Sequence, residues 1–315
     1  MVDFRKLILF GKSSFIISIP KNWVQKNGLK KGDLVYIEEK SSELVLYPKE
    51  PAKQEVKEIL INADRKSFED LHSEIVTAYL NNYGLIRIEG HSLKNESREI
   101  KNVIHNLMGM EIIEETSSLI VAKDLLDIKE VSIEKLIRRM DIVARSMLED
   151  SIETFDLKDN SKSIYERDTD VNRLAFLARR VMRGVVENPS LSKHFGINLP
   201  ELWISQRVII QVERIADQAK KISSIKISSL KLESRKTLKN LYILINKQYG
   251  EAMAVYYSRN KPKSYILSSE KSKTIKYCDE LLEKTSNHVF IHCIEHFKRI
   301  LYSSRDILRC LMEIE

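Results

Sequence analysis

The chain has 315 residues, with 52 Lys and Arg against 45 Asp and Glu, and a net charge of +7. This length predicts two or three domains, the basic balance is typical of a protein with a polyanionic partner, and 43% hydrophobic residues are enough for real cores. No apolar run approaches the roughly 20 residues of a membrane span, and nothing resembles a signal peptide. The three cysteines, Cys278, Cys293 and Cys310, do not have the paired spacing of a metal site. Because their number is odd, they indicate a reducing cytoplasm rather than a disulfide-bonded protein.

Residues 11–29 read GKSSFIISIPKNWVQKNGL and predict a cationic loop, a short strand and a short helix. Residues 15–19 alternate as a strand with both faces largely buried, and Pro20 ends it. Residues 21–26 form one or two helical turns, since proline is tolerated where a helix starts and Asn27-Gly28 is a good stop.

A hairpin follows, with strands at 34–38 and 43–46 around the turn Ser41-Ser42. Four short strands and one small helix bury little apolar surface, and units of about 40 residues usually need disulfides, metals or oligomerisation. This first unit has no cysteine. We therefore predict that a second copy of the chain completes it.

Basic residues dominate the first unit. Up to Lys31 it carries seven cations against Asp3 alone: Arg5, Lys6, Lys12, Lys21, Lys26, Lys30 and Lys31. A merely solvated lysine face is the ordinary alternative, but the near absence of acids favours a surface that binds phosphate groups. Gly11-Lys12-Ser13 is not a P-loop, because that motif needs a glycine where Lys6 stands and a helix where a strand follows.

The order of these features resembles the AbrB/SpoVT/MazE family of swapped-hairpin DNA-binding domains. The resemblance covers about residues 2–48 and rests on five features in order. These are a Gly-basic loop, a strand ending in Ile-Pro, a short helix ending in Gly-Leu, the turn Lys-Gly-Asp and a Val-rich strand. It implies a homodimer with interlaced hairpins that binds double-stranded DNA through Arg5, Lys6, Lys12 and Lys21. Val24 and Gln25 stand where relatives often place paired arginines.

After the linker Pro48-Lys49-Glu50-Pro51, alternating strand and helix patterns predict a small α/β domain over 51–127. Helices are expected at 68–80 and 97–107, and strands at 59–61, 84–89, 111–115 and 117–121. The scattered His72, His91 and His105 form no catalytic cluster.

From about residue 128 onward, the apolar positions recur with the period of helical bundles. The pattern predicts two three-helix bundles in tandem, at about 128–226 and 230–315, with the second set at 238–256, 269–284 and 287–314. The whole chain is thus predicted as a multidomain α+β protein with domains at 1–50, 51–127 and 128–315.

Two pairs of acids stand four residues apart in the first repeat: Glu166 with Asp170 in YERDTDVNRL, and Glu213 with Asp217 in VERIADQAKKI. This spacing puts both members of a pair on one helix face. Pairs on neighbouring helices can supply oxygen ligands to one hard or borderline cation. On spacing alone, an exposed acidic face paired with arginines is favoured over a metal site, the candidates being Arg167, Arg173 and Arg214.

Both segments resemble the helix motifs of the PhoU family, over roughly residues 131–314. The resemblance implies a divalent or iron-type metal ion held by Glu166, Asp170, Glu213 and Asp217, with Asp168 as an extra ligand. It also implies a negative regulator of phosphate uptake and phosphate-responsive signalling that works with a phosphate transporter.

The second repeat departs from this motif. Lys298, Tyr302 and Thr274 stand where Glu213, Asp217 and Asp170 stand in the first, so we expect no comparable metal site there. His288, His292 and His296 recur every four residues on its last helix. Three ligands on successive turns span about 12 Å, too far for one ion. We interpret them as a polar face, with a pH-sensitive patch as the weaker alternative.

The chain has no nucleophile elbow, dinucleotide-binding glycine pattern or zinc-protease motif, so we do not expect an enzyme. We predict a cytoplasmic, homodimeric transcription regulator whose first domain binds DNA and whose bundle senses or scaffolds a phosphate-linked signal. This arrangement resembles that of archaeal PhoU-like regulators. The alternative is a module that docks on a phosphate transporter and uses its N-terminal domain for dimerisation. An antitoxin role is suggested by the first domain alone, and the long bundle argues against it.

Overall fold

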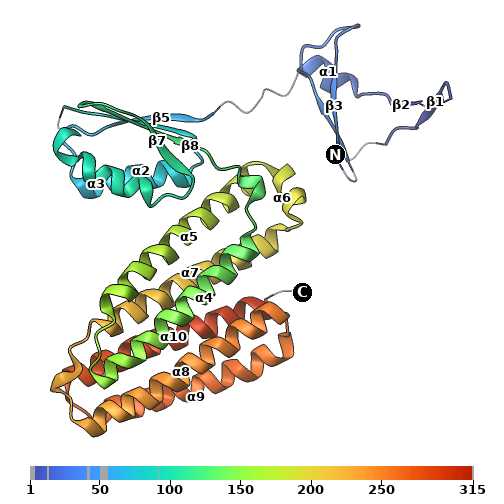
Figure 1. Ribbon diagram of the computed structural model, residues 1–315. Coiled ribbons are helices and arrows are strands. Elements are labelled where there is room, and N and C mark those ends of the chain that lie inside the picture. The colour runs from blue at the N-terminus through green and yellow to red at the C-terminus, as the bar shows by residue number, and fades with distance from the viewer. Residues whose placement is uncertain (1–3, 13, 41–42, 50–55, 92, 314–315) are drawn as a thin grey trace. The chain divides into compact units, whose positions relative to one another are not determined.

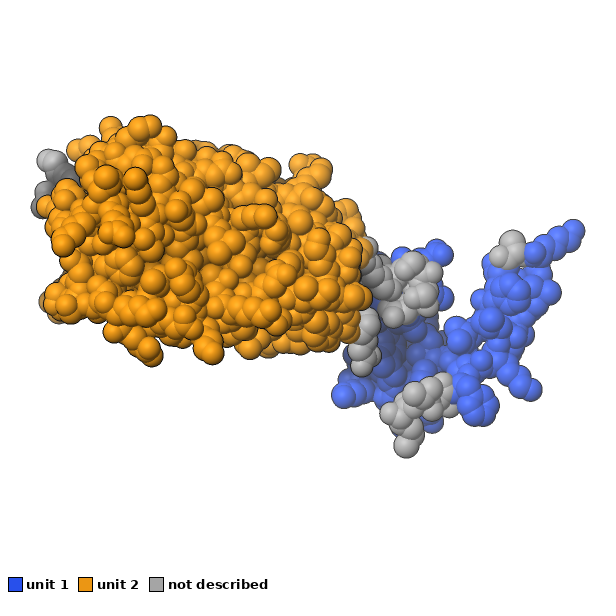
Figure 2. All heavy atoms as spheres, turned by 90° about the horizontal axis from the view of Figure 1, so that it is seen from below, with its two compact units in different colours: residues 1–56 blue, residues 57–315 orange. Residues whose placement is uncertain are grey.

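The computed structural model describes residues 4–12, 14–40, 43–49, 56–91 and 93–313. It divides into two compact units, residues 1–56 and 57–315 (Figures 1 and 2). The first unit contains short hairpins and one helix, and the second contains a mixed sheet followed by long helices. The turn predicted at Ser41-Ser42 and the linker residues Glu50 and Pro51 lie outside the described residues.

The first unit forms two antiparallel hairpins. β1 (Ile8–Phe10) pairs with β2 (Ser14–Ile16), and β3 (Tyr36–Lys40) pairs with β4 (Glu43–Tyr47). The turn after β1 uses Gly11 at φ +69°, in the left-handed region that favours glycine. β2 ends three residues before the predicted end of its strand, so this boundary was wrong while the strand itself is confirmed.

None of the described residues in this unit is buried. Leu9 and Phe15 pair on one face of the β1–β2 hairpin and are 63% and 65% exposed, and Ile8 and Phe10 on the other face are equally open. The prediction that both faces of this strand are buried is therefore wrong for a single chain, because the unit has no second layer to cover them. An exposed apolar surface of this kind marks an interaction site.

Helix α1 (Lys21–Lys26) starts and stops where the sequence predicts. Pro20 precedes its first residue, which costs no hydrogen bond because the first N–H groups of a helix lack intrahelical partners. Gly28 takes φ +69°, and Leu29 N–H then returns to the Val24 carbonyl at 3.0 Å. This left-handed glycine satisfies a carbonyl at the helix end.

The second unit begins with a four-stranded sheet in the order β5-β6-β8-β7. β5 (Glu58–Asn62) and β6 (Leu85–Glu89) are parallel, and β8 (Leu119–Asp124) is antiparallel to both β6 and β7 (Met110–Glu115). The crossover helix α2 (Phe68–Leu80) and α3 (Leu93–His105) cover one face of this sheet (Figure 1). The mixed α/β region is confirmed.

Two sets of three long helices follow. The first set is α4 (Ile133–Ile152), α5 (Ser161–Glu187) and α7 (Leu199–Ser223). The second is α8 (Leu232–Ser258), α9 (Lys261–Glu283) and α10 (His288–Met312). A short α6 (Pro189–Phe195), which we did not predict, joins α5 to α7. Because α7 packs against α10 and α4 against α8, both sets share one continuous apolar core.

Polar caps set the first residues of α7 and α10. The Asn198 side chain accepts the Glu201 N–H at 2.8 Å, and the Glu201 carboxylate accepts the Asn198 N–H at 3.2 Å. This reciprocal capping box satisfies two donors that would otherwise lack partners. Asn287 caps α10 by accepting the Phe290 N–H at 3.1 Å.

One polar residue in the second set is costly to bury. Lys271 on α9 is fully buried, and no partner within hydrogen-bond distance of its Nζ exists among the described residues. Burial lowers the pKa of Lys271 to about 8, against the opposing effect of the Glu251 and Glu270 charges. The folded protein therefore buries an ammonium that has no hydrogen-bonded anion among the described residues.

We expect the substitution Lys271→Met to stabilise the protein by up to about 3 kcal/mol at pH 7, since it removes the cation and keeps the alkyl length. Between pH 8 and 10.5 the unfolded wild type binds more protons than the folded form, so wild-type stability rises with pH and the advantage of the variant shrinks. Urea unfolding at pH 7 and pH 10 measures both effects. An equal difference at the two pH values would contradict this account.

Candidate functional site

The four cations assigned to DNA contact are all exposed on the first unit. Lys12 lies in the turn between β1 and β2, Lys21 is the first residue of α1, and Arg5 and Lys6 precede β1. No acidic residue occurs between positions 4 and 32. A surface of this charge attracts phosphate groups. Contact of these four residues with DNA stays a prediction.

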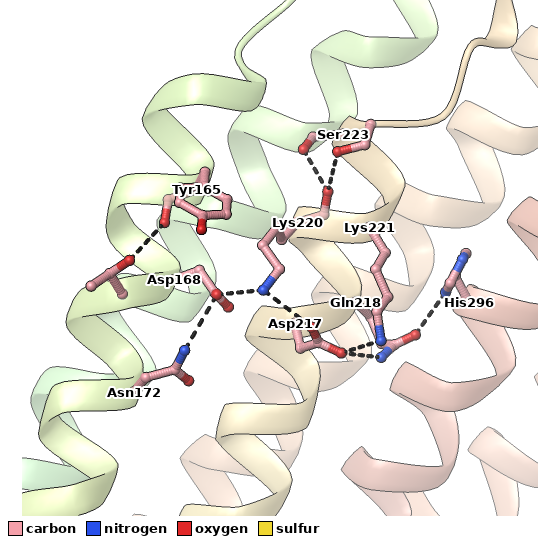
Figure 3. Close-up of polar contacts among 11 residues, drawn as sticks. Tyr165, Asp168, Asn172, Asp217, Gln218, Lys220, Lys221, Ser223 and His296 are labelled. Carbon is pink, nitrogen blue, oxygen red and sulfur yellow. Dashed lines mark hydrogen bonds and ion pairs between the residues drawn. The ribbon is translucent and has the colours of Figure 1, made fainter. Parts of the chain in front are cut away.

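Asp168 of α5 and Asp217 of α7 lie where these helices face each other, and Lys220 links the two carboxylates (Figure 3). Lys220 Nζ lies 2.5 Å from Asp168 Oδ2 and 3.3 Å from Asp217 Oδ1. Asp168 is only 4% exposed. Burial lowers the pKa of Lys220, but its hydrogen bond to Asp168 and the charges of both aspartates outweigh that effect and raise the pKa. Lys220 is therefore held as an ammonium.

Glu213 joins the same group of carboxylates. It lies one turn before Asp217 on α7 and pairs with Arg179 of α5. Burial raises the pKa of Glu213, and the nearby charges of Asp168 and Asp217 raise it further, whereas Arg179 lowers it. Three of the five predicted carboxylates, those of Asp168, Glu213 and Asp217, therefore lie close enough to affect one another's charge.

The other two acids lie elsewhere. Glu166 and Asp170 are exposed, and Asp170 is 3.7 Å from Arg173 of its own helix. Each stands two positions from Asp168, which is roughly 200° around an α-helix, so α5 cannot turn all three toward α7. Asp168, which we predicted as an extra ligand, is thus the α5 carboxylate that faces α7.

These carboxylates do not form an open cation site. Lys220 and Lys221 pair with Asp217, Lys220 pairs with Asp168, and Arg179 pairs with Glu213. Within the described part of the chain, no group of three or more His, Cys, Asp or Glu side chains is arranged to hold a metal ion. A metal at this place would first have to displace the ammonium of Lys220. The predicted metal ligation therefore does not fit this arrangement and stays a prediction.

Sequence reasoning missed Lys220 and Arg179 as the partners of the acids. Of the arginines considered instead, Arg167 pairs with Asp150 at 2.5 Å and Arg173 pairs with Asp170. Lys220 could have been found, since it follows Asp217 by three residues on the same helix face. Arg179 could not, because its pairing depends on the register of α5 against α7.

The polar network extends from α7 to α10 (Figure 3). Gln218 Nε2 donates to Asp217 Oδ2 at 3.2 Å, and Gln218 Oε1 lies 2.7 Å from Nδ1 of His296. His296 is 4% exposed, and burial lowers its pKa to about 4. The interpretation of the three histidines as one polar face is therefore wrong for His296, because α10 packs that residue against α7.

The second repeat carries different chemistry at the matching positions. Lys298, which stands at the position of Glu213, pairs with Asp279 of α9. Thr274, at the position of Asp170, accepts a hydrogen bond from Gln248 Nε2 at 2.9 Å. A lysine pair and a neutral hydrogen bond thus replace the acids of the first repeat.

None of the helices in the described ranges is both long enough and apolar enough to cross a membrane. Two family models match the chain. The model described as "Antidote-toxin recognition MazE, bacterial antitoxin" matches residues 8–54, and the PhoU domain model matches residues 137–225, which include all five predicted acids. Comparison with the curated proteins and with the solved structures finds no significant match. The chain therefore carries a MazE-type domain at its N-terminal end and a PhoU domain in its helical region.

Proposed function

We propose that this protein is a DNA-binding transcription regulator of phosphate uptake that acts as a homodimer. The MazE-type match supports DNA binding and dimerisation, and the PhoU match supports a role in phosphate homeostasis. The observation that carries the proposal is the character of the first unit. It exposes cations and large apolar side chains together, and none of its described residues is buried.

Dimerisation would serve both features of that unit. A second copy would cover the apolar hairpin faces, and it would double the set of exposed cations around a two-fold axis. Two-fold symmetry matches the paired half-sites of regulatory DNA, and each neutralised phosphate releases counterions. The dimer is thus the form in which the cationic surface becomes large enough for useful affinity.

The PhoU domain is the proposed input of the phosphate-linked signal. Its helices share one apolar core with the helices of the second repeat, so we expect a change at one helix contact to affect the neighbouring helices. A signal alters DNA binding only if the protein has two states with different affinities for the signal molecule. A phosphate transporter is the proposed source of that signal.

Charge reversal in the first unit tests DNA binding. We expect the double substitution Lys12→Glu/Lys21→Glu to weaken DNA affinity at least about 100-fold at low salt, because four cations per dimer become anions. The slope of log affinity against log salt should also flatten by up to about 3.6, at about 0.9 per lost phosphate contact. Fluorescence titrations at several salt concentrations measure both quantities.

The matched control is Lys273→Glu/Lys276→Glu, which makes the same charge change at two exposed positions of α9. We expect the affinity of this variant to stay within about threefold of wild type, since α9 lies outside the MazE-type domain that we assign to DNA contact. If the two double variants bind DNA equally well, the first unit does not contact DNA and the proposed function fails.

A second candidate function is docking on a phosphate transporter, and one surface favours it. Val186, Leu199 and Trp203 are 61–65% exposed around a groove of about 540 Å³ that is lined by the PhoU domain and by Leu80 of α2. Exposed apolar patches with an aromatic anchor are typical of protein interfaces. Under this alternative, cells carrying Lys12→Glu/Lys21→Glu would still restrain phosphate uptake, whereas a DNA-binding regulator would lose that control.

A further inference from the structure

Two histidines on α10 lie with their ring nitrogens face to face. His292 and His296 are one helical turn apart, and their Nε2 atoms are 3.1 Å apart. His292 is exposed and His296 is buried, so the pair connects solvent to the interface of α10 with α7. The residues involved match none of the acid positions of the PhoU motif.

Hydrogen bonds from α7 determine which nitrogen of His296 carries its proton. Gln218 donates through Nε2 to the carboxylate of Asp217, which fixes the orientation of the Gln218 amide. Its Oε1 therefore faces His296 Nδ1 at 2.7 Å and can only accept a hydrogen bond. His296 must then carry its proton on Nδ1, and the lone pair on its Nε2 points toward His292.

This arrangement is the usual setting of a metal-binding histidine. A ligating imidazole commonly donates its second N–H to an oxygen acceptor, which fixes the tautomer and orientation of the ring. Two nitrogens 3.1 Å apart, each about 2.05 Å from one ion, subtend an angle of about 100° at that ion. That angle lies between the values for square-planar and tetrahedral coordination. His292 needs only to carry its proton on Nδ1 for both lone pairs to face the ion.

We propose that His292 and His296 form a two-histidine site for a borderline divalent transition metal such as Cu(II), Ni(II) or Zn(II), with water in the remaining positions. Imidazole ligands select these ions, whereas carboxylates suit harder cations. The site is thus distinct from the carboxylates that face α5. It does not depend on the proposed DNA-binding function.

Neighbouring charges set the strength of this site. Asp217 favours a cation near His296, while Lys221 and Arg299 oppose one. Lys221 is partly neutralised by Asp217, with its Nζ 2.5 Å from a carboxylate oxygen. A metal bound here would hold His296 in its packed position and so stabilise the contact between the two repeats. We therefore expect bound metal to raise the thermal unfolding temperature.

Cu(II) and Ni(II) titrations of the full chain, prepared without a histidine tag, test the site. Wild type should bind one Cu(II) that shows nitrogen hyperfine splitting in its electron paramagnetic resonance spectrum, and His292→Ala should lose that signal. His292→Ala should also weaken Ni(II) binding at least about tenfold. Losing a hydrogen-bond partner of a metal ligand already weakens metal binding about 10- to 100-fold, and losing a ligand itself should cost at least as much. His292 is exposed, so this substitution preserves the fold.

The control is His288→Ala, since His288 is exposed on the same helix one turn before the pair. It should leave both the spectrum and the Ni(II) affinity unchanged. Gln218→Met should weaken Ni(II) binding about 10- to 100-fold without removing a ligand, because it frees the His296 tautomer. A Cu(II) spectrum with oxygen ligands only, or equal Ni(II) affinity in wild type and His292→Ala, would overturn the proposal.

Discussion

The double substitution Leu9→Asp/Phe15→Asp is expected to convert the proposed homodimer to a monomer at micromolar concentration. These side chains pair across β1 and β2 and are more than 60% exposed in one chain. Burying one large apolar side chain contributes about 1.5–3 kcal/mol, and four such side chains are lost per dimer. The dimer should weaken by at least about 6 kcal/mol, or more than about 10,000-fold in dissociation constant.

Sedimentation equilibrium measures this change, and circular dichroism checks that the helices remain. The matched control is Ile142→Asp/Ile266→Asp, which places two aspartates at exposed isoleucines of α4 and α9. That control should stay dimeric. If the control dissociates and Leu9→Asp/Phe15→Asp does not, the dimer interface lies on the helices, and the role assigned to the first unit is wrong.

The second large effect is expected at Arg180, which joins the sheet of the second unit to its helices. Arg180 is 2% exposed on α5, pairs with Asp124 at the end of β8, and donates through Nε to Asn82 at 3.2 Å. Its guanidinium also lies 4.5 Å from the centre of the Tyr79 ring on α2. Arg180→Met leaves Asp124 without its cation and should cost roughly 3–5 kcal/mol of unfolding free energy.

Arg183→Met is the control for that measurement. Arg183 lies three residues further along α5, is half exposed, and pairs with Glu187 one turn away. An exposed pair of this kind contributes less than about 1 kcal/mol, so urea unfolding should separate the two variants clearly. Hydrogen exchange should show that Arg180→Met reduces the protection of amide protons in α2 and β8 rather than in α10. Equal stability of the two variants would show that the buried pair does not hold the sheet against the helices.

Periodicity and end signals predicted most of the elements correctly. The predicted helix 68–80 coincides with α2, which Ser67 caps by accepting the Asp70 N–H at 3.1 Å. The three predicted helices of the second repeat are also present, but α8 and α9 begin six and eight residues before the predicted starts at 238 and 269. The order of the sheet strands and the short α6 were not predictable, because neither depends on a local pattern.

The candidate site was predicted less well, for a geometric reason. Spacing showed that Glu213 and Asp217 share a face of α7, but it could not show which face of α5 meets them. The choice between Asp168 and its neighbours depends on the packing of α5 against α7, and so does the pairing of Glu213 with Arg179. Likewise, the pattern of residues 15–19 showed two apolar faces, but it could not show that the described part of one chain has no second layer to cover them.

The most direct test of the central claim is selection of genomic DNA fragments by the full-length protein, followed by sequencing of the fragments retained near physiological salt. We predict a small set of discrete sites, next to genes for phosphate uptake, that are retained by wild type and lost with Lys12→Glu/Lys21→Glu. Retention of the same unselected fragments by both proteins would contradict the claim that this chain is a DNA-binding regulator.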